Sequence, residues 1–321
     1  MNDRVPDGWL ISAYVAAPPV WDRGEHARYY DAIAELDGVA GFEIPFSGSL
    51  HPHDEAWFLR RVTARHAYTI TTIPDTMHQL AHDPMFGLAS VDAAGRAAAI
   101  ARTARTAAAV RRCNDAAGAR VVRAVTLYSA PRSREKRSDG ARFAESLAAV
   151  TEFDWDGARV VIEHCDAPVA DRRVVKGFLP LEDEVSAVGA ARERTGIDLG
   201  IQLNWGRSVV EGRTHTTAAD HIATVRAAGL LAGFTLSGCA PVDTSHGPAW
   251  DDCHVPPDPL CPVSELTSAR IAATLAALGA ARIMRGIKVS APTGADLATR
   301  IDTVARTLSV VQAAERRAAG R

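Results

Sequence analysis

The sequence has few of the features that mark secreted, membrane-spanning or disulfide-bonded proteins. Its five cysteines among 321 residues are dispersed and never form a CxxC pair, which argues against a disulfide framework and for a reducing compartment. No apolar run approaches the roughly 18 residues of a membrane span. The N-terminal segment has no basic stretch followed by an apolar one, as a signal peptide would. These absences predict a cytoplasmic protein.

The chain also lacks an excess of positive charge and any internal repeat. Its formal net charge is −2, so it has no electrostatic footprint for nucleic acid or an anionic membrane. We therefore expect a small-molecule substrate as its partner, and neither nucleic acid nor membrane. A homodimer is an expectation from fold analogy alone.

What the sequence does contain is eight short apolar segments, each followed by a longer segment with a helical pattern. Such alternation predicts βαβ units and a parallel sheet. Eight pairs predict a single (β/α)₈ TIM barrel over residues 1–321. An open doubly wound sheet is the alternative, but the turn after the first strand, AAPPVWD, has no glycine for a phosphate. The predicted strands span 9–17, 38–46, 67–74, 120–130, 158–166, 199–205, 232–238 and 283–290, and the helices span 24–36, 54–64, 92–117, 140–151, 181–194, 218–228, 268–278 and 295–318.

The loops that follow the predicted strands are long and rich in His, Trp, Pro and Gly, whereas those that lead back to the strands are short. In a barrel of this kind the carboxyl-end loops build the active site. The segment APRSREKRSD, after the fourth strand, is either a mobile flap or a solvated charge run.

The most informative segment is VVIEHCD, which ends the fifth strand. If Glu163 points into the barrel, His164 points away and Cys165 points inward, because side chains alternate along a strand. Glu163 then suits a general base or a metal ligand, and Asp166 a contact with substrate. The alternative is a buried structural carboxylate that pairs with a neighbouring Arg or Lys.

The segment QLNWGRSVVEGR ends the sixth strand. Asn204 can fix a hydroxyl or carbonyl group, and Arg207 and Arg213 offer forked donors for an anionic group. Trp205 can form an apolar wall for a sugar ring or can simply pack the loop. Glu211 is expected to pair with one of the two arginines.

Histidines gather in two of the strand-end loops. Glu43 lies in the second strand, and His51 and His53 follow in its loop, where we expect substrate contacts. In the loop after the seventh strand, His246 and His254 flank a Trp and two Asp residues. This set suits either a metal or a rigid lid, and lid or substrate contact is favoured because no recognised zinc spacing occurs.

Several longer stretches together resemble a known family. They are GFEIPFSGSLHPHDEAWFL, VIEHCD, KGFLPLEDE, NWGRSVVEGR, HIATVRAAGLLAGFTLSG and GIKV. These stretches extend over nearly the whole chain and are similar to a bacterial family, domain of unknown function 4862. That family resembles part of the xylose-isomerase-like TIM-barrel superfamily of sugar isomerases and epimerases.

The superfamily resemblance implies one divalent metal, held at strand ends by a Glu, an Asp, a His and a second Glu, with two carboxylates as acid and base. Glu163 matches the first ligand. Asn204 stands in the place of the Asp, and Arg207 where a following His is often found. Ser237 or Thr235 stands in the place of the strand-seven His.

In the place of the final Glu stands Lys288, in the eighth strand. A Lys inside a barrel is costly to bury and is usually paired or functional. It can pair with Glu163, act as acid, base or anion anchor, or supply the positive charge of the metal. The expected cofactor is therefore none or one divalent metal.

These features favour an isomerase or epimerase that moves a proton next to the carbonyl of a sugar or polyol derivative. Glu163 would be the base, His164 or His246 the acid, and Lys288, with Asn204 and Arg207, would hold the oxygen. A lyase or dehydratase shares the first step. A non-catalytic binding barrel is the second hypothesis, and a metal-dependent phosphodiesterase ranks last.

Overall fold

The computed structural model describes residues 5–319, so the start of the N-terminal segment, residues 1–4, lies outside it. The strands are β1 (Trp9–Ile11), β2 (Val39–Pro45), β3 (Ala67–Thr71), β4 (Val122–Leu127), β5 (Arg159–Glu163), β6 (Gly200–Asn204), β7 (Leu231–Leu236) and β8 (Met284–Ile287). The α-helices are α1 (Arg23–Ala34), α2 (Glu55–Leu59), α3 (Ile73–His82), α4 (Ala93–Ala117), α5 (Gly140–Thr151), α6 (Leu181–Thr195), α7 (Trp205–Gly212), α8 (Thr216–Ala227), α9 (Ser268–Leu278) and α10 (Leu297–Ala319). Two 3₁₀ turns, η1 (Ala13–Val15) and η2 (Arg134–Lys136), complete the set.

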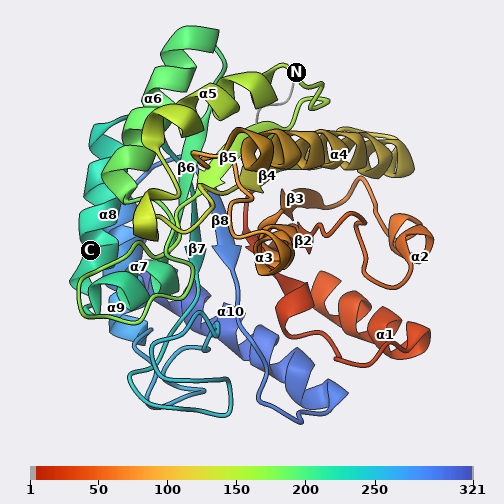
Figure 1. Cartoon of the computed structure of the whole chain (residues 1–321). Helices are drawn as coiled ribbons and strands as arrows, with labels where there is room; N and C mark the ends of the chain where they lie inside the picture. Colours follow the sequence, from red (N-terminus) through yellow and green to blue (C-terminus); the bar gives the residue numbers. More distant parts are fainter. Residues whose placement is uncertain (1–4, 320–321) are drawn as a thin grey trace. The chain divides into compact units, whose positions relative to one another are not determined.

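The eight strands form a closed barrel in the order β1 to β8, with at least one helix after each strand (Figure 1). The predicted (β/α)₈ barrel is confirmed, and the open-sheet alternative is wrong.

Within this chain we describe two compact units separately. Among the described residues, the first comprises 5–43, 204–223 and 233–319, and the second comprises 44–203 and 224–232. In the first unit β1 pairs with β2 and β8, and β7 pairs with β8, all in parallel. In the second unit β3 to β6 pair in sequence, also in parallel, and α5 packs beside α6 (Figure 1). That the barrel is a single domain stays a prediction.

Side-chain caps explain where many of the helices begin. The carboxylate of the residue before the helix accepts a backbone N–H three residues on, at Asp22, Asp54, Asp92 and Asp139. Such a cap satisfies one of the unpaired amides of the first turn. Gly196 ends α6 in the left-handed conformation at φ 70°, which glycine adopts without strain.

The structure differs from the prediction in two strand-end segments that the sequence suggested were loops. Residues 73–82 form helix α3, with a proline in the first turn, and residues 205–212 form helix α7. Both helices are short and start directly beside a strand end, so the strand signal masks their first turn. In addition, the predicted helix over residues 54–64 is confined to Glu55–Leu59.

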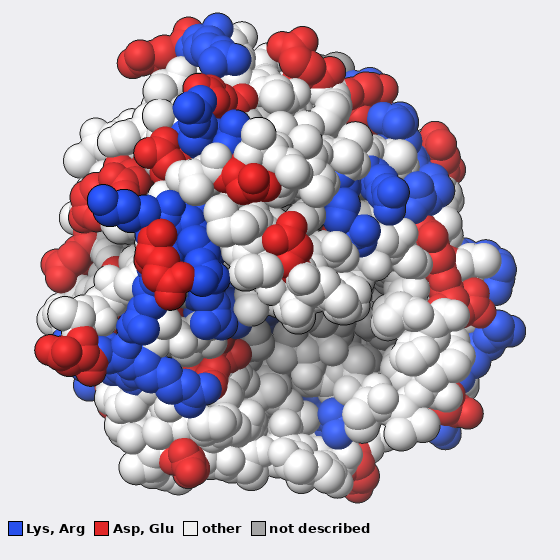
Figure 2. Space-filling model, viewed as in Figure 1, with Lys and Arg blue, Asp and Glu red and all other residues white. Residues whose placement is uncertain are grey.

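No helix among residues 5–319 is long and apolar enough to cross a membrane. Side chains of both signs appear on the face drawn in Figure 2, and Lys and Arg gather toward its left side. All five cysteines are free thiols, four of them buried. A disulfide framework, which the sequence argued against, is therefore absent from the described residues.

Candidate functional site

A row of four buried polar side chains lies at the carboxyl ends of four neighbouring strands in the first unit. Ile11 pairs with Phe42 on one side and with Ile287 on the other, and Ile287 pairs with Leu236. Backbone hydrogen bonds carry the β1–β8 and β8–β7 ladders one residue further. Paired residues of adjacent strands share a face, so the next residues project together. We call them the polar row: Glu43, Ser12, Lys288 and Ser237, each at most 6% exposed.

The centre of the polar row is the ion pair between Lys288 and Glu43. The Lys288 Nζ donates to Glu43 Oε1 at 2.8 Å, and the same oxygen accepts from Ser12 Oγ at 2.9 Å and from the Tyr14 hydroxyl at 3.2 Å. The ammonium also lies 5.2 Å from the centre of the Tyr14 ring. All three of these donors are on Glu43 Oε1. The arrangement fixes a buried positive charge beside Glu43.

Sequence reasoning named Lys288 and Glu43 separately and missed the two hydroxyls that join them. Ser12 and Tyr14 carry no motif, because a three-residue strand followed by a short 3₁₀ turn has no visible period. A buried Lys is expected to have a partner, and the partner of Lys288 is Glu43.

The sixth strand leads directly into α7. Asn204 is the N-cap of this helix, and its side-chain oxygen accepts from the backbone N–H of Arg207 at 3.3 Å. Trp205 is 1% exposed, which agrees with the packing interpretation of that residue. Gly206 is required here because a Cβ at this position would lie 2.8 Å from the carbonyl oxygen of Ser237. The start of α7 is thus pressed against the end of β7.

A chain of polar contacts joins α7 to the loop after β7. Arg207 Nε donates to Asp252 Oδ2 at 3.1 Å, and Asp252 Oδ1 lies 3.3 Å from His254 Nδ1. The same ring nitrogen lies 2.9 Å from Ser237 Oγ, in the polar row. Arg207 and Asp252 are almost fully buried, at 1% and 5% side-chain exposure. Asp252 is one of the two Asp residues that the sequence groups with His246 and His254, without a separate role.

Two further predicted residues, His246 and Arg213, also have contacts at the loop after β7. His246 Nδ1 lies 3.0 Å from the hydroxyl of Ser290, and burial lowers the pKa of His246 below its ordinary value of 6.5. Arg213 stacks on Trp250, with its guanidinium carbon 4.7 Å from the ring centre. The stacked Arg213 supports the loop, and the acid role of His246 stays a prediction.

In the second unit Glu163 ends β5 and is 1% exposed. Its Oε2 accepts a short hydrogen bond from the hydroxyl of Tyr128, which directly follows β4. The Tyr128 hydroxyl in turn lies 2.7 Å from Thr71 Oγ1. Glu163 and its β6 partner Gln202 share a face of the sheet. This carboxylate is therefore anchored by a hydroxyl network, which the sequence did not reveal.

The next residue, His164, has its own buried partners. Its Nδ1 lies 2.7 Å from Glu184 Oε2, on α6, and Glu184 Oε1 accepts from Ser129 Oγ at 2.5 Å. All three side chains are at most 1% exposed. Asp166 accepts the backbone N–H groups of Val175 and Lys176 at 2.7 and 2.9 Å, so its carboxylate closes the loop after β5.

Of the two predicted histidines after β2, His51 stabilises the turn that precedes α2. His51 Nδ1 accepts the backbone N–H groups of His53 and Asp54 at 3.3 and 3.1 Å. The ring of His51 also stacks on Phe58, with centres 6.2 Å apart. His51 is buried and holds the turn before α2, whereas His53 is exposed. Their contact with a substrate stays a prediction.

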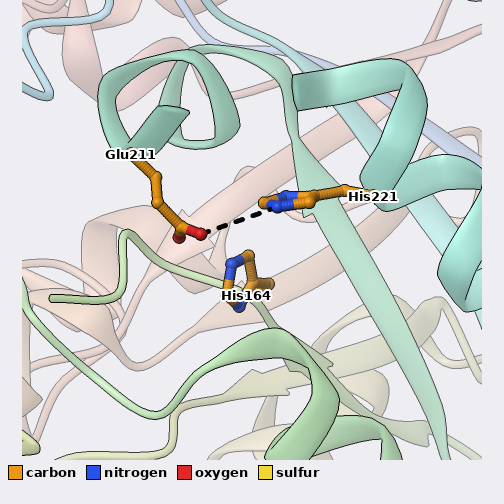
Figure 3. A group of neighbouring side chains, drawn as sticks. All are labelled: His164, Glu211 and His221. Atoms are coloured by element: carbon orange, nitrogen blue, oxygen red, sulfur yellow. Dashed lines mark ion pairs between the residues drawn. The ribbon is translucent and has the colours of Figure 1, made fainter. Parts of the chain in front are cut away.

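Glu211 has a histidine as one partner, and its predicted pairing with an arginine stays a prediction. Its Oε1 lies 3.6 Å from His221 Nε2, and His221 Nδ1 lies 3.0 Å from Ser208 Oγ. Figure 3 draws His164, Glu211 and His221, and its dashed line marks the Glu211–His221 ion pair. The pair joins α7 to α8 within the first unit.

The positions where the resemblance implies metal ligands do not fit a divalent cation. Only Glu163 offers a carboxylate. The side-chain oxygen of Asn204 caps α7, and Lys288 brings an ammonium that a cation would repel. Ser237 offers a neutral hydroxyl already close to His254. This donor set therefore gives no support for a metal at the superfamily position.

Comparison with known proteins places this chain. Residues 10–303 match the family described as a domain of unknown function, DUF4862. The chain belongs to that family. It is similar to "Uncharacterized protein STM3670" of Salmonella typhimurium, at 28% identity, with 97% of this chain and 98% of that protein covered.

Solved structures show the fold of this DUF4862 member. D-psicose 3-epimerase of Clostridium cellulolyticum H10, solved with D-tagatose, has a TM-score of 0.57 at 14% identity, covering 97% of this chain and 98% of that one. A xylose isomerase domain protein of Planctomyces limnophilus has a TM-score of 0.55 at 12% identity, covering 99% of both chains. The barrel is thus xylose-isomerase-like, and identities this low show the fold alone.

Proposed function

We propose that this protein is an isomerase or epimerase that moves a proton at the carbon next to the carbonyl of a carbohydrate-like substrate. The observation that carries the proposal is the buried ion pair of Lys288 and Glu43 at strand carboxyl ends. Proton transfer of this kind needs a fixed positive group beside the developing enediolate oxygen. The D-psicose 3-epimerase with the same fold supports the carbohydrate class.

In the proposed reaction each residue has a distinct role. Lys288 polarises the substrate carbonyl and stabilises the negative charge that develops on its oxygen, while Glu43 Oε1 holds the ammonium in place. Glu43 Oε2 accepts a substrate hydroxyl. Glu163 stays the base that the sequence predicts, and the Tyr128 hydroxyl orients its carboxylate within the second unit. A general base contributes typically 10²–10⁴-fold to such a rate.

The experiment is proton exchange with solvent. The full-length protein, treated with EDTA, is incubated in D₂O with a panel of ketoses, aldoses and sugar acids, and deuterium at the carbon next to the carbonyl is measured by NMR. We expect incorporation in at least one substrate, and a fall of about 10²-fold or more for Glu163→Gln and for Lys288→Met. Product analysis separates isomer formation from elimination of water by a lyase.

Matched controls use exposed residues of the same types. Glu145→Gln and Lys136→Met remove an exposed carboxylate and an exposed ammonium and should leave the exchange rate unchanged. Binding of a sugar without exchange by the wild-type protein would show a binding barrel instead. Exchange that disappears with EDTA and returns with Mn²⁺ or Mg²⁺ would contradict the metal-free role of Lys288.

A further inference from the structure

The loop after β7 returns a histidine to the ends of two strands. The backbone N–H of Val255 donates to the carbonyl of Gly238 at 2.9 Å, and the N–H of Ser290 donates to the carbonyl of His254 at 2.8 Å. Gly238 is required for this approach, because a Cβ there would lie 2.3 Å from the oxygen of Val255. His254 itself is held at φ 57°, a left-handed conformation that non-glycine residues seldom adopt. Such strain collects at functional positions.

The neighbours of His254 determine which ring nitrogen carries the proton. Asp252 Oδ1 lies 3.3 Å from Nδ1, and a buried carboxylate beside an unprotonated nitrogen would set two lone pairs against each other. Nδ1 is therefore the N–H nitrogen, and Ser237 Oγ at 2.9 Å can share it as an acceptor. Nε2 is then the nitrogen that takes up and returns a proton.

Arg207, at the other end of this chain of contacts, holds Asp252 in position. Its second oxygen accepts from Arg207 Nε at 3.1 Å, on the first turn of α7. The close approach of Gly206 to Ser237 ties that turn to β7. The order Arg207, Asp252, His254 thus resembles the arrangement in which a buried acid orients a catalytic imidazole. Ser237, which contacts the ring, belongs to the same polar row as Lys288.

We propose that His254 is the acid–base residue for the substrate oxygen, with Asp252 and Arg207 as its positioning residues. This inference rests on the proposed function. Protonated His254 gives its Nε2 proton to the carbonyl oxygen as the C–H proton passes to the carboxylate base, which forms a neutral enediol. When the enediol returns to a carbonyl, Nε2 takes a hydroxyl proton back and the base returns its own to carbon. No oxidant or further reactant is required.

The first test needs no substrate. In protein labelled with ¹⁵N-histidine, the ring nitrogen shifts of neutral His254 should show a protonated Nδ1 and an unprotonated Nε2. In Asp252→Asn the amide oxygen must accept from Arg207, which turns the NH₂ group toward His254 and forces the proton to Nε2. A wild-type ring protonated at Nε2, or a tautomer unchanged in Asp252→Asn, overturns the assignment.

The second test follows deuterium exchange. His254→Gln should lower kcat by about 10²-fold or more and Asp252→Asn by a similar factor, with KM little changed, while His78→Gln, an exposed control on α3, keeps the wild-type rate. His254→Gln at the wild-type rate overturns the role of His254 and leaves the proposed function standing. Wild-type protein that exchanges no proton with any sugar defeats the proposed function itself, and the catalytic role of His254 falls with it.

Discussion

Removal of the Lys288 ammonium tests whether the ion pair of the polar row has the energetics that its burial implies. Lys288→Met keeps most of the stem volume and leaves Glu43, 6% exposed, without its cation. Breaking a buried pair from one side costs about 3–5 kcal/mol, because the remaining charge is uncompensated. Two neutral donors, Ser12 and Tyr14, stay on the carboxylate, so we expect the lower end, about 3 kcal/mol.

Urea denaturation followed by tryptophan fluorescence measures this change. With a slope of about 3 kcal/mol per molar urea, the midpoint of Lys288→Met should fall by about 1 M. The double variant Lys288→Met/Glu43→Gln removes both charges and should recover most of the loss, which gives a coupling energy of about 2 kcal/mol. Lys136→Met, an exposed control, should change stability by no more than about 0.5 kcal/mol. Equal midpoints for Lys288→Met and Lys136→Met, or no recovery in the double variant, would refute the reasoning.

Three further predictions concern stability and reactivity. Because burial lowers the pKa of His246 below 6.5, the unfolded chain takes up this proton first, and stability is lost as the pH falls below that value. The Tm of the wild type should therefore drop more than that of His246→Gln between about pH 7.5 and pH 5.5. Burial raises the pKa of Cys239 to about 12, so mass spectrometry should find it unlabelled by iodoacetamide at about pH 8 until urea unfolds the chain. Gly206→Ala should lower the free energy of unfolding, measured by urea denaturation, by about 1–3 kcal/mol, because its Cβ would lie 2.8 Å from a backbone oxygen. Gly189→Ala, whose Cβ meets nothing within 4 Å, should not lower it.

Local sequence signals predict most of the strands and helices and the barrel that they form. Eight apolar segments each followed by a helical pattern predict the barrel, and single residues mark several helix ends. Thr267 accepts the N–H of Arg270 at the start of α9, and Gly196 ends α6, as their residue types suggest. These signals are local because caps and turns depend on neighbours in the chain, which the sequence shows directly.

Short helices at strand ends were harder to predict. Helix α7 begins with Trp205, immediately after β6, so the apolar residues there fit a strand as well as a helix. One available signal was Asn204, since Asn is a favoured N-cap and Arg207 follows three residues later. The superfamily resemblance implies a ligand position at Asn204, whereas its side-chain oxygen caps α7.

Contacts across the site could not be predicted, because they depend on how distant strands are registered. Lys288 and Glu43 are 245 residues apart, and only the pairing of β8 with β1 and of β1 with β2 brings them together. The residue types predict that a buried Lys and a buried Glu each need a partner of opposite charge. Which partner each has follows from register, and a shift of one residue would turn both side chains to the other face.

The differences from the superfamily ligands are linked to one another rather than independent. An ammonium buried in place of a carboxylate needs a counter-charge, and Glu43 supplies it with two supporting hydroxyls. Asn204 in place of an acid releases its oxygen to cap α7, and that helix places Arg207 on Asp252. Lys288, Asn204 and Arg207 therefore each have a specific contact with another polar group. The contacts of Lys288 and Asn204 thus lead to the polar row and to the chain of contacts that reaches His254, and the proposed function and the further inference both rest on these groups.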